Sequence, residues 1–315
     1  MKDIVSVLTK NELAAFTLRA LYADYGYEQY KMSKFEEYDL YVKNKDFLVS
    51  ESVITFTDTD GRLMALKPDV TLSIIKNTKE TAGVKKIFYH ENVYRVSGSE
   101  RSYKEIMQAG LECLGEVDEG VLAETVFLAE KSLQSISSSY ALEISSLDFV
   151  AETLRFAKVS EAGKAEILVC LGEKNEQGVL AVCEREGLGE EATSALKALV
   201  SSYGAPEEVF ARFENCPMNG DMVAALQALK TLIDRVKSLG GGKKLTVDFS
   251  VLGNMKYYNG IAFKGFIEGL PSGVLSGGRY DNLMAKMGKR SRGVGFAVYL
   301  DGFDRLPEAN EEAGV

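Results

Sequence analysis

The sequence predicts an α+β fold, in which an antiparallel sheet is flanked by helices and carries a helical insertion. Segments with the residue pattern of strands occur before residue 145 and again after residue 243. The stretch between them is mainly helical, charged and rich in alanine. Because the strands before the insertion follow one another as hairpins, we expect antiparallel pairing and not a doubly wound parallel sheet.

The elements before the insertion follow from the periodicity of apolar residues and from turn signals. Pro68 marks a helix start, since the fixed backbone angle of proline suits the first turn of a helix. A polar loop at residues 96–102 joins two strands that are rich in aliphatic and aromatic residues. In chain order we expect a helix at 7–25, strands with a hairpin at 28–66, a helix at 68–77, paired strands at 85–95 and 104–114, and a helix at 119–135.

The helical insertion is predicted to span residues 146–242. Its alanine-rich stretches at residues 190–202 and 221–238 are typical of helices, and the run Gly240-Gly241-Gly242 closes it. Strands return from residue 243 onward. We therefore expect a core made of residues 1–145 and 243–315, with the insertion as a smaller unit, and 315 residues are enough for both.

Composition argues against several functions. No apolar run is long enough to cross a bilayer, and Asp3 interrupts the short apolar stretch at the start, so neither a membrane protein nor a signal peptide is expected. The four cysteines lack the paired spacing of metal ligands, and we expect reduced thiols in a cytoplasmic protein and no zinc. His90 is the single histidine, so a Ser-His or Cys-His catalytic machine would depend on it alone, and an ordinary strand residue is expected instead.

The charge balance argues against nucleic acid as a partner. The chain has 37 basic and 46 acidic residues and a net charge of −9, and its isoelectric point is about 5.0. Recognition of a nucleic-acid backbone depends on clustered Lys and Arg that neutralise phosphates. We therefore expect that no tRNA binds.

The strand predicted at residues 104–114 carries a candidate binding surface. Gln108, Gly110 and Glu112 have the same parity and therefore point to one face of the sheet. The amide and the carboxylate are roughly 13 Å apart along the strand, and glycine leaves space between them. A small polar ligand could lie over that gap. The same pattern also fits the solvated face of an ordinary antiparallel sheet, and the spacing alone does not decide between the two.

The segment from residue 91 to residue 115 resembles motif 2 of class II aminoacyl-tRNA synthetases, and most specifically that of histidyl-tRNA synthetase. The resemblance extends through most of the chain, including the GGRYD run at residues 277–281. It implies the antiparallel catalytic sheet of that family. It also implies dimerisation through the first helix, whose apolar residues Leu13, Phe16, Leu21 and Tyr25 belong either to an interface or to the core. The residues of motif 2 that match are Tyr94, Arg95, Tyr103, Lys104, Glu105, Gln108, Gly110 and Glu112.

The resemblance also implies an amino-acid pocket. Asp69 and Thr71 fall where the family holds the amino group of its substrate, although Pro68-Asp69 alone also reads as a simple helix start. Tyr257 and Tyr258 match a histidine-specific element, and two adjacent tyrosines on a strand are expected to point to opposite faces. The expected histidine-binding residues are Asp69, Thr71, Arg95, Gln108, Glu112, Tyr257 and Tyr258.

Two positions depart from the family where its reaction needs positive charge. Gly253 and Gly302 stand where the family has arginines that contact phosphates. Arg305 lies three residues farther along, and on the helix expected there such a shift moves a side chain about 5 Å, so it is not expected to replace the lost contact. Adenylation needs cations at the transferring phosphoryl group, and we expect this chemistry to be lost.

A synthetase-like chain that has lost adenylation is similar to the HisZ family, the regulatory subunits of bacterial ATP phosphoribosyltransferase in histidine biosynthesis. That resemblance implies a non-catalytic subunit that senses histidine and needs no cofactor. It implies a homodimer within a hetero-oligomer with the short-form ATP phosphoribosyltransferase catalytic subunit. The sequence continues for only about ten residues after the helix expected near residue 306, so we expect no anticodon-binding domain there.

Two alternatives remain open at the level of sequence. The chain could still activate histidine or transfer it to an acceptor, as an enzyme of the histidyl-tRNA synthetase family. It could also be a scaffold whose pocket no longer binds a ligand.

Overall fold

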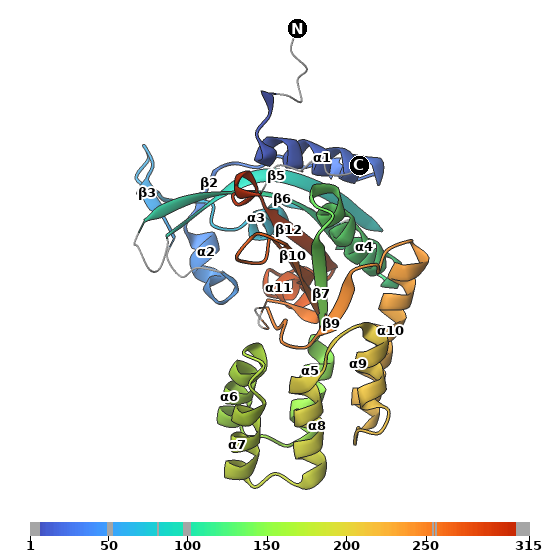
Figure 1. Cartoon of the computed structure of the whole chain (residues 1–315). Helices are drawn as coiled ribbons and strands as arrows, with labels where there is room; N and C mark the ends of the chain where they lie inside the picture. Colours follow the sequence, from blue (N-terminus) through green and yellow to red (C-terminus); the bar gives the residue numbers. More distant parts are fainter. Residues whose placement is uncertain are drawn as a thin grey trace, which may run out of the picture.

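The computed structural model describes residues 7–48, 53–80, 82–96, 102–253, 255 and 257–306. Its largest element is a nine-stranded sheet that runs through the centre of the molecule (Figure 1). In chain order its strands are β1 (Glu28–Gln29), β5 (Val84–Val96), β6 (Tyr103–Gly115), β7 (Tyr140–Ser146), β8 (Tyr203–Gly204), β9 (Leu245–Asp248), β10 (Asn259–Ile267), β11 (Leu275–Arg279) and β12 (Arg292–Tyr299). Their spatial order is β1-β5-β6-β12-β11-β10-β7-β9-β8.

The six strands from β5 to β7 in this order pair antiparallel with one another. Parallel pairs occur only toward the edges, between β1 and β5 and between β7 and β9, within the described part of the chain. The predicted antiparallel sheet is therefore confirmed. The hairpin β5–β6 extends the two expected strands by one residue at each end.

Helices α1 (Lys10–Asp24) and α4 (Glu119–Ile136) cover one face of the sheet and enclose the main core (Figure 1). Helix α1 begins three residues later than expected, because Thr9 and Glu12 form a reciprocal capping box at its start. The helix buries Leu18 and Tyr22. Leu13 and Phe16 are instead 42% and 55% exposed, so these two residues are not part of the core.

The opposite face of the sheet is covered by helices α3 (Val70–Asn77) and α11 (Asp281–Lys286), which share a second apolar cluster. A small sheet stands beside them, with strand order β2-β4-β3 and bounds Phe35–Glu37, Leu63–Leu66 and Thr55–Thr57. The short helices α2 (Asp39–Lys43) and η2 (Lys45–Phe47) follow β2 in the chain. Helix α3 begins two residues after Pro68, because Asp69 has an extended backbone and caps the helix with its side chain.

Between β7 and β9 the chain forms the helical segment, which extends below the sheet in Figure 1. An aromatic cluster of Phe149, Phe213 and Phe249, with ring centroids 5.0 to 5.9 Å apart, ties it to the end of β9. The proposed division at residues 146 and 242 stays a prediction. The helices of this segment are α5 (Leu147–Phe156), α6 (Glu161–Gly172), α7 (Glu176–Glu186), α8 (Glu190–Ser201), α9 (Pro206–Phe213) and α10 (Gly220–Ser238).

The helix expected after β12 is not an α-helix in the described residues. The chain forms only the short 3₁₀ helix η3 (Phe303–Arg305), which packs against α1. Asn11 donates a hydrogen bond to Asp304 at 2.7 Å and fixes this contact. Arg305 is exposed. Across the described ranges, no helix combines the length and the hydrophobicity that a membrane span requires.

Candidate ligand-binding site

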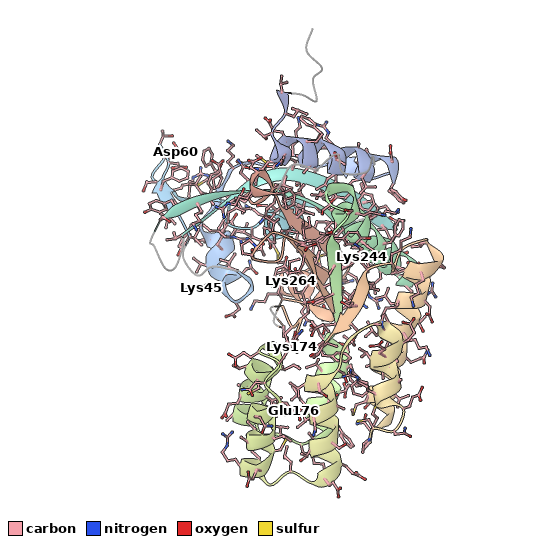
Figure 2. All side chains as sticks on the ribbon, viewed as in Figure 1. Lys45, Asp60, Lys174, Glu176, Lys244 and Lys264 are labelled. Carbon is pink, nitrogen blue, oxygen red and sulfur yellow. The ribbon has the colours of Figure 1, made fainter. Side chains whose placement is uncertain are left out.

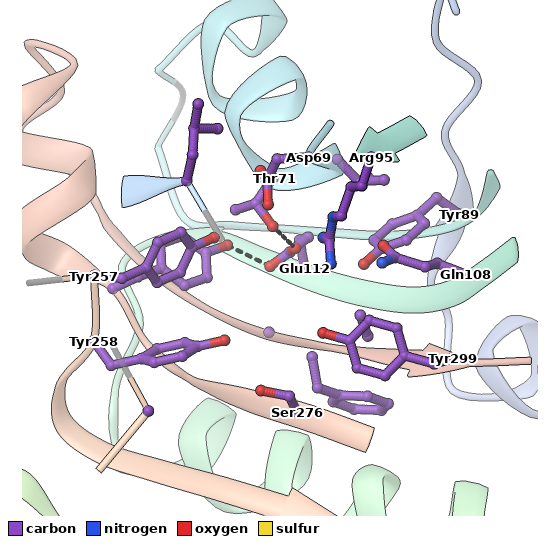
Figure 3. Close-up of a pocket in the computed structure, with 17 residues that line it drawn as sticks. Asp69, Thr71, Tyr89, Arg95, Gln108, Glu112, Tyr257, Tyr258, Ser276 and Tyr299 are labelled. Carbon is purple, nitrogen blue, oxygen red and sulfur yellow. Dashed lines mark hydrogen bonds between the residues drawn. The ribbon is translucent and has the colours of Figure 1, made fainter. Parts of the chain in front are cut away.

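A cavity of about 370 Å³ lies between the sheet and helix α3 (Figure 3). This volume is within the range of sites that hold small molecules. All seven residues expected to bind histidine line it, so the structure brings together side chains from three distant parts of the chain. The lining residues are Leu48, Asp69, Val70, Thr71, Tyr89, Arg95, Gln108, Glu112, Gly253, Tyr257, Tyr258, Ser276, Tyr280, Gly295, Phe296, Ala297 and Tyr299.

Strand alternation places the polar side chains of β6 in the cavity. Leu111 and Cys113 belong to the core beneath α1 and α4, whereas Gln108 and Glu112 point to the other face. Opposite Glu112, strand β12 has Gly295. A β-carbon on Gly295 would lie only 1.9 Å from Oε2 of Glu112, so glycine is needed for the carboxyl group to occupy this position.

Glu112 is the most deeply buried acid of the cavity, with 2% of its surface exposed. The hydroxyl of Thr71 donates to Oε1 at 2.7 Å, and the hydroxyl of Tyr280 donates to Oε2 at 2.5 Å. Burial raises the pKa of Glu112 to about 8, although these two hydrogen bonds lower it and the nearby Asp69 raises it. This shift favours the protonated form of the carboxyl group at neutral pH.

Asp69 has two roles, since it caps helix α3 and also lines the cavity. Its Oδ1 accepts the backbone N–H of Leu72 at 2.8 Å. Burial raises the pKa of Asp69, and the cap and the neighbouring Arg95 partly oppose this effect. Arg95 is held by a 3.1 Å bond from Nε to the carbonyl oxygen of Pro68. Among the described residues that line the cavity, Arg95 alone carries a permanent positive charge.

Hydroxyl groups make up much of the remaining surface. Burial is the main cause that raises the pKa of each tyrosine in the cavity, so all five stay neutral at physiological pH and act as hydrogen-bonding groups. These tyrosines are Tyr89, Tyr257, Tyr258, Tyr280 and Tyr299. Three of them were not expected from the sequence, although Tyr280 lies in the GGRYD run and Tyr299 shares the face of Gly295 on β12. Ser276 was also not expected.

The expected arrangement of Tyr257 and Tyr258 was wrong. The two residues precede β10 and do not lie on a strand, so strand alternation does not separate their side chains. Their rings contact each other edge to face, with centroids 4.7 Å apart, and both line the cavity. The ring of Tyr258 fits between Gly253 and Gly278, where β-carbons would approach it to within 2.9 and 2.7 Å.

The space over Gly110 is not left for a ligand. Tyr89 is the direct partner of Gly110 across the β5–β6 hairpin, and its hydroxyl would lie 2.5 Å from a β-carbon at that position. Gly110 therefore makes room for Tyr89, and the tyrosine brings its own hydroxyl into the cavity. Sequence spacing cannot show this, because the filling side chain comes from the neighbouring strand. His90, next in β5, is exposed, as expected for an ordinary strand residue.

No group of three or more His, Cys, Asp or Glu side chains that could hold a metal ion occurs in the part of the chain that the structure describes. The four cysteines are all free thiols. The cavity instead contains two acids, Asp69 and Glu112, and one arginine, Arg95. Each of these side chains forms a hydrogen bond within the chain.

Comparison with known proteins gives consistent matches. The family described as Histidyl-tRNA synthetase matches residues 7–303. An ATP phosphoribosyltransferase regulatory subunit from Clostridium kluyveri is 30% identical over 301 residues, which cover 93% of this chain and 77% of that protein. This chain belongs to the histidyl-tRNA synthetase family, with the ATP phosphoribosyltransferase regulatory subunits as its relatives.

Solved structures of the family share the fold. A structure from Bacillus halodurans, described as an ATP phosphoribosyltransferase regulatory subunit/histidyl-tRNA synthetase, superposes with a TM-score of 0.83 at 23% identity and covers 94% of this chain and 78% of that one. A chain of the ATP phosphoribosyl transferase (HisG:HisZ) complex from Thermotoga maritima gives a TM-score of 0.72 at 16% identity, with 93% of this chain and 98% of that chain covered. These likenesses agree with the expected class II synthetase-like core.

Relative to the family, the cavity lacks positive charge at the two expected positions. Gly253 lines the cavity but has no side chain. Gly302 precedes η3, and neither Gly302 nor Arg305 is among the residues that line the cavity. Residues 97–101, in the polar loop between β5 and β6, lie outside the described residues. The predicted departure thus leaves Arg95 as the one cation of the described cavity wall.

Proposed function

We propose that this chain is the non-catalytic regulatory subunit of an ATP phosphoribosyltransferase and that free histidine binds in its cavity. Family membership supports the regulatory role, because the named relatives are such subunits and match most of this chain. The observation that carries the ligand proposal is the set of three ionisable groups in one buried cavity, an acid, an arginine and a carboxyl that is mainly protonated.

The charges suit a free amino acid with an imidazole side chain. Asp69 is placed to hold the ammonium group, with Thr71 and Gln108 beside it, and Arg95 is the group that suits the carboxylate. Glu112 and Tyr257 would bind the imidazole. A protonated Glu112 can donate a hydrogen bond to a neutral ring nitrogen, and an ionised Glu112 can accept one from an imidazolium.

Adenylation by this subunit is not expected. Attack of a carboxylate on ATP builds negative charge on the transferring phosphoryl group and on pyrophosphate, and positioned cations provide most of the stabilisation. Gly253 supplies none, and Arg305 does not line the cavity. Losing one such cation typically raises the barrier by about 3 kcal/mol, which favours a regulatory role over a residual histidine-activating enzyme.

The proposed assembly is a hetero-oligomer. The short-form ATP phosphoribosyltransferase catalytic subunit is the proposed partner, and the complex from Thermotoga maritima supports it. The exposed apolar residues Leu13 and Phe16 of α1, and Tyr25 directly after it, support a homodimer within that assembly. A cytoplasmic location follows from a role in amino-acid biosynthesis, and neither tRNA nor a membrane is a proposed partner. Histidine in the cavity would then change the activity of the partner by favouring one quaternary state.

Calorimetric titration with histidine tests the proposal. The wild-type chain should bind histidine, and Glu112→Ala should weaken binding about 100-fold, because hydrogen bonds to ionisable groups contribute about 1.5–3 kcal/mol. Glu105→Ala is the matched control, since Glu105 lies on the same strand, bonds Tyr94 at 2.9 Å and is exposed. If the wild-type chain binds no histidine but still stimulates the catalytic subunit, the pocket is vestigial and the chain is a scaffold.

A further inference from the structure

A second cavity, of about 440 Å³, lies between the helical segment and the sheet. It is lined by Gly172 and Lys174 of the helical segment and by residues 250–253, which connect β9 to the turn before β10. Gly253, Tyr258 and Ser276 line both this cavity and the proposed histidine pocket. Residues 249–253, here called the wall segment, therefore lead to Gly253, which lies between the two cavities.

The wall segment is held at its start by Asp248, which is 4% exposed. Oδ1 of Asp248 accepts the backbone N–H of Ser250 at 2.8 Å, and its carbonyl oxygen accepts the N–H of Val251 at 3.1 Å. Phe249 and Val251 of the segment pack into the core, and the cavity lies on its other side. The contacts of Asp248 add to this packing, so the orientation of Asp248 contributes to the path of the backbone toward Gly253.

Asp248 in turn is oriented by a residue of the helical segment. Lys174 lies in the turn between α6 and α7, and its Nζ is 2.5 Å from Oδ2 of Asp248. The ammonium also lies over the ring of Tyr203, 4.4 Å from the centroid. Partial burial alone would lower the pKa of Lys174, but the bond to Asp248 outweighs it and the pKa is raised. Figure 2 shows Lys174 at the junction between the helical segment and the sheet.

The backbone of Lys174 is in the left-handed region, with φ of 54°. This conformation is unfavourable for a lysine, and the surrounding contacts hold it. Asn175, the next residue, caps α7 by accepting the N–H of Gly178 at 2.9 Å. The turn that carries the lysine is therefore fixed to the helices, so a movement of the helical segment would move the Lys174 ammonium and, with it, Asp248.

We propose that Lys174 is a positioning residue for the histidine pocket, and that its ion pair with Asp248 couples the placement of the helical segment to the shape of the pocket wall. The inference rests on the proposed function, since it concerns the same ligand. By reciprocity, histidine that contacts the wall favours one placement of the helical segment, which offers a route from the pocket to a bound partner. Lys174 does not line the histidine pocket and acts only through Asp248.

Histidine affinity of the intact chain tests this. Lys174→Met should weaken histidine binding about fivefold, the effect usual for coupled residues outside a site, and Lys174→Arg should restore binding close to wild type. Lys197→Met is the matched control, because Lys197 forms an exposed ion pair with Glu176, 3.2 Å, within the helical segment. Hydrogen–deuterium exchange gives a second readout, and in Lys174→Met it should rise in the wall segment without a rise in β5 and β6.

The outcomes separate the two proposals. Absence of histidine binding by the wild-type chain contradicts the proposed function itself. Wild-type binding with equal affinity in Lys174→Met, and unchanged exchange in the wall segment, overturns the role of Lys174 alone. An equal loss of affinity in Lys197→Met would also overturn it, since the effect would then follow from general loosening of the helices. If Lys174→Met proves unstable, the affinities of Lys174→Gln and Lys174→Arg decide the question in the same way.

Discussion

The two walls of the cavity differ in the polar side chains that they present to it. On the wall formed by α3, β6 and the start of α11, Glu112 keeps both oxygens hydrogen-bonded, to Thr71 and to Tyr280. On the wall that leads from β9 to β10, Gly253 presents only backbone, and Tyr258 fills the adjoining space. The first wall presents hydrogen-bonding groups to the cavity, whereas the described residues of the second wall present no charged side chain.

This contrast is what the proposed function requires, namely a site that binds an amino acid and does not activate it. The acids of the first wall are hydrogen-bonded within the folded chain, Glu112 to Thr71 and Tyr280 and Asp69 to the backbone N–H of Leu72. Arg305 lies on the short 3₁₀ helix η3, which packs against α1, and it does not line the cavity.

The largest expected effect concerns the protonated carboxyl of the first wall. The unfolded chain releases the proton of Glu112 near its ordinary pKa of 4.5, whereas the folded chain holds it until about pH 8. The folded pKa is the higher one, so this stability is fully present below pH 4.5 and is lost as pH rises to 8. The loss from this group should be on the order of 5 kcal/mol in the free energy of unfolding.

Urea unfolding of wild type and Glu112→Gln at several pH values measures this effect. Glutamine keeps the shape of the side chain but does not titrate, so the variant should lack the decline that Glu112 causes. Other ionisable groups contribute equally to both proteins and cancel in the difference. Two stability curves that run parallel from pH 4.5 to pH 8 would show that Glu112 is ionised in the folded chain.

The next effect concerns the glycine that admits Glu112. In Gly295→Ala the new methyl group would overlap Oε2 of Glu112, and the backbone oxygen of Leu111 would lie only 2.4 Å away. The variant should lose about 2 kcal/mol of stability, as other overpacked sites do, and most of its histidine affinity. Calorimetry and urea unfolding measure the two quantities. Gly220→Ala is the control, because nothing lies within 4 Å of a β-carbon there, and it should be neutral. Unchanged binding by Gly295→Ala contradicts the proposed pose.

A smaller effect is expected when an arginine is returned to the second wall. Gly253 has φ of 56°, and a β-carbon would lie 2.9 Å from Cδ2 of Tyr258. Gly253→Arg should therefore cost about 1–2 kcal/mol of stability and weaken histidine binding by displacing Tyr258. It should not restore adenylation, because Gly302 still leaves a second position without charge. Urea unfolding and a pyrophosphate exchange assay test both statements, and measurable exchange in this variant alone would mean that one cation suffices.

Sequence reasoning predicted the antiparallel sheet and the β5–β6 hairpin from strand patterns. The resemblance to the histidyl-tRNA synthetase family supplied most of the seven expected residues that line the cavity, and strand parity supplied Gln108 and Glu112. It failed where a side chain from another strand occupies space in the cavity. Tyr89 occupies the space over Gly110 from the neighbouring strand, and Tyr299 enters from β12. The separation of Tyr257 from Tyr258 was wrong because their backbone leaves the strand pattern before β10. Such placements depend on tertiary packing, which local periodicity does not contain.

The smallest expected effect is the absence of a signal. In an ATP–pyrophosphate exchange assay, wild type should give no histidine-dependent exchange above the level without histidine, since Arg95 is the one cation of the described cavity wall. The same preparation should bind histidine by calorimetry, which shows that the protein is folded and the pocket open. A histidyl-tRNA synthetase assayed in parallel provides the positive control. Exchange by the wild-type chain would mean that a cation reaches the phosphates from another part of the chain or from a second subunit. The missing charge on the second wall would then be supplied on assembly, and the proposal of a non-catalytic subunit would be wrong.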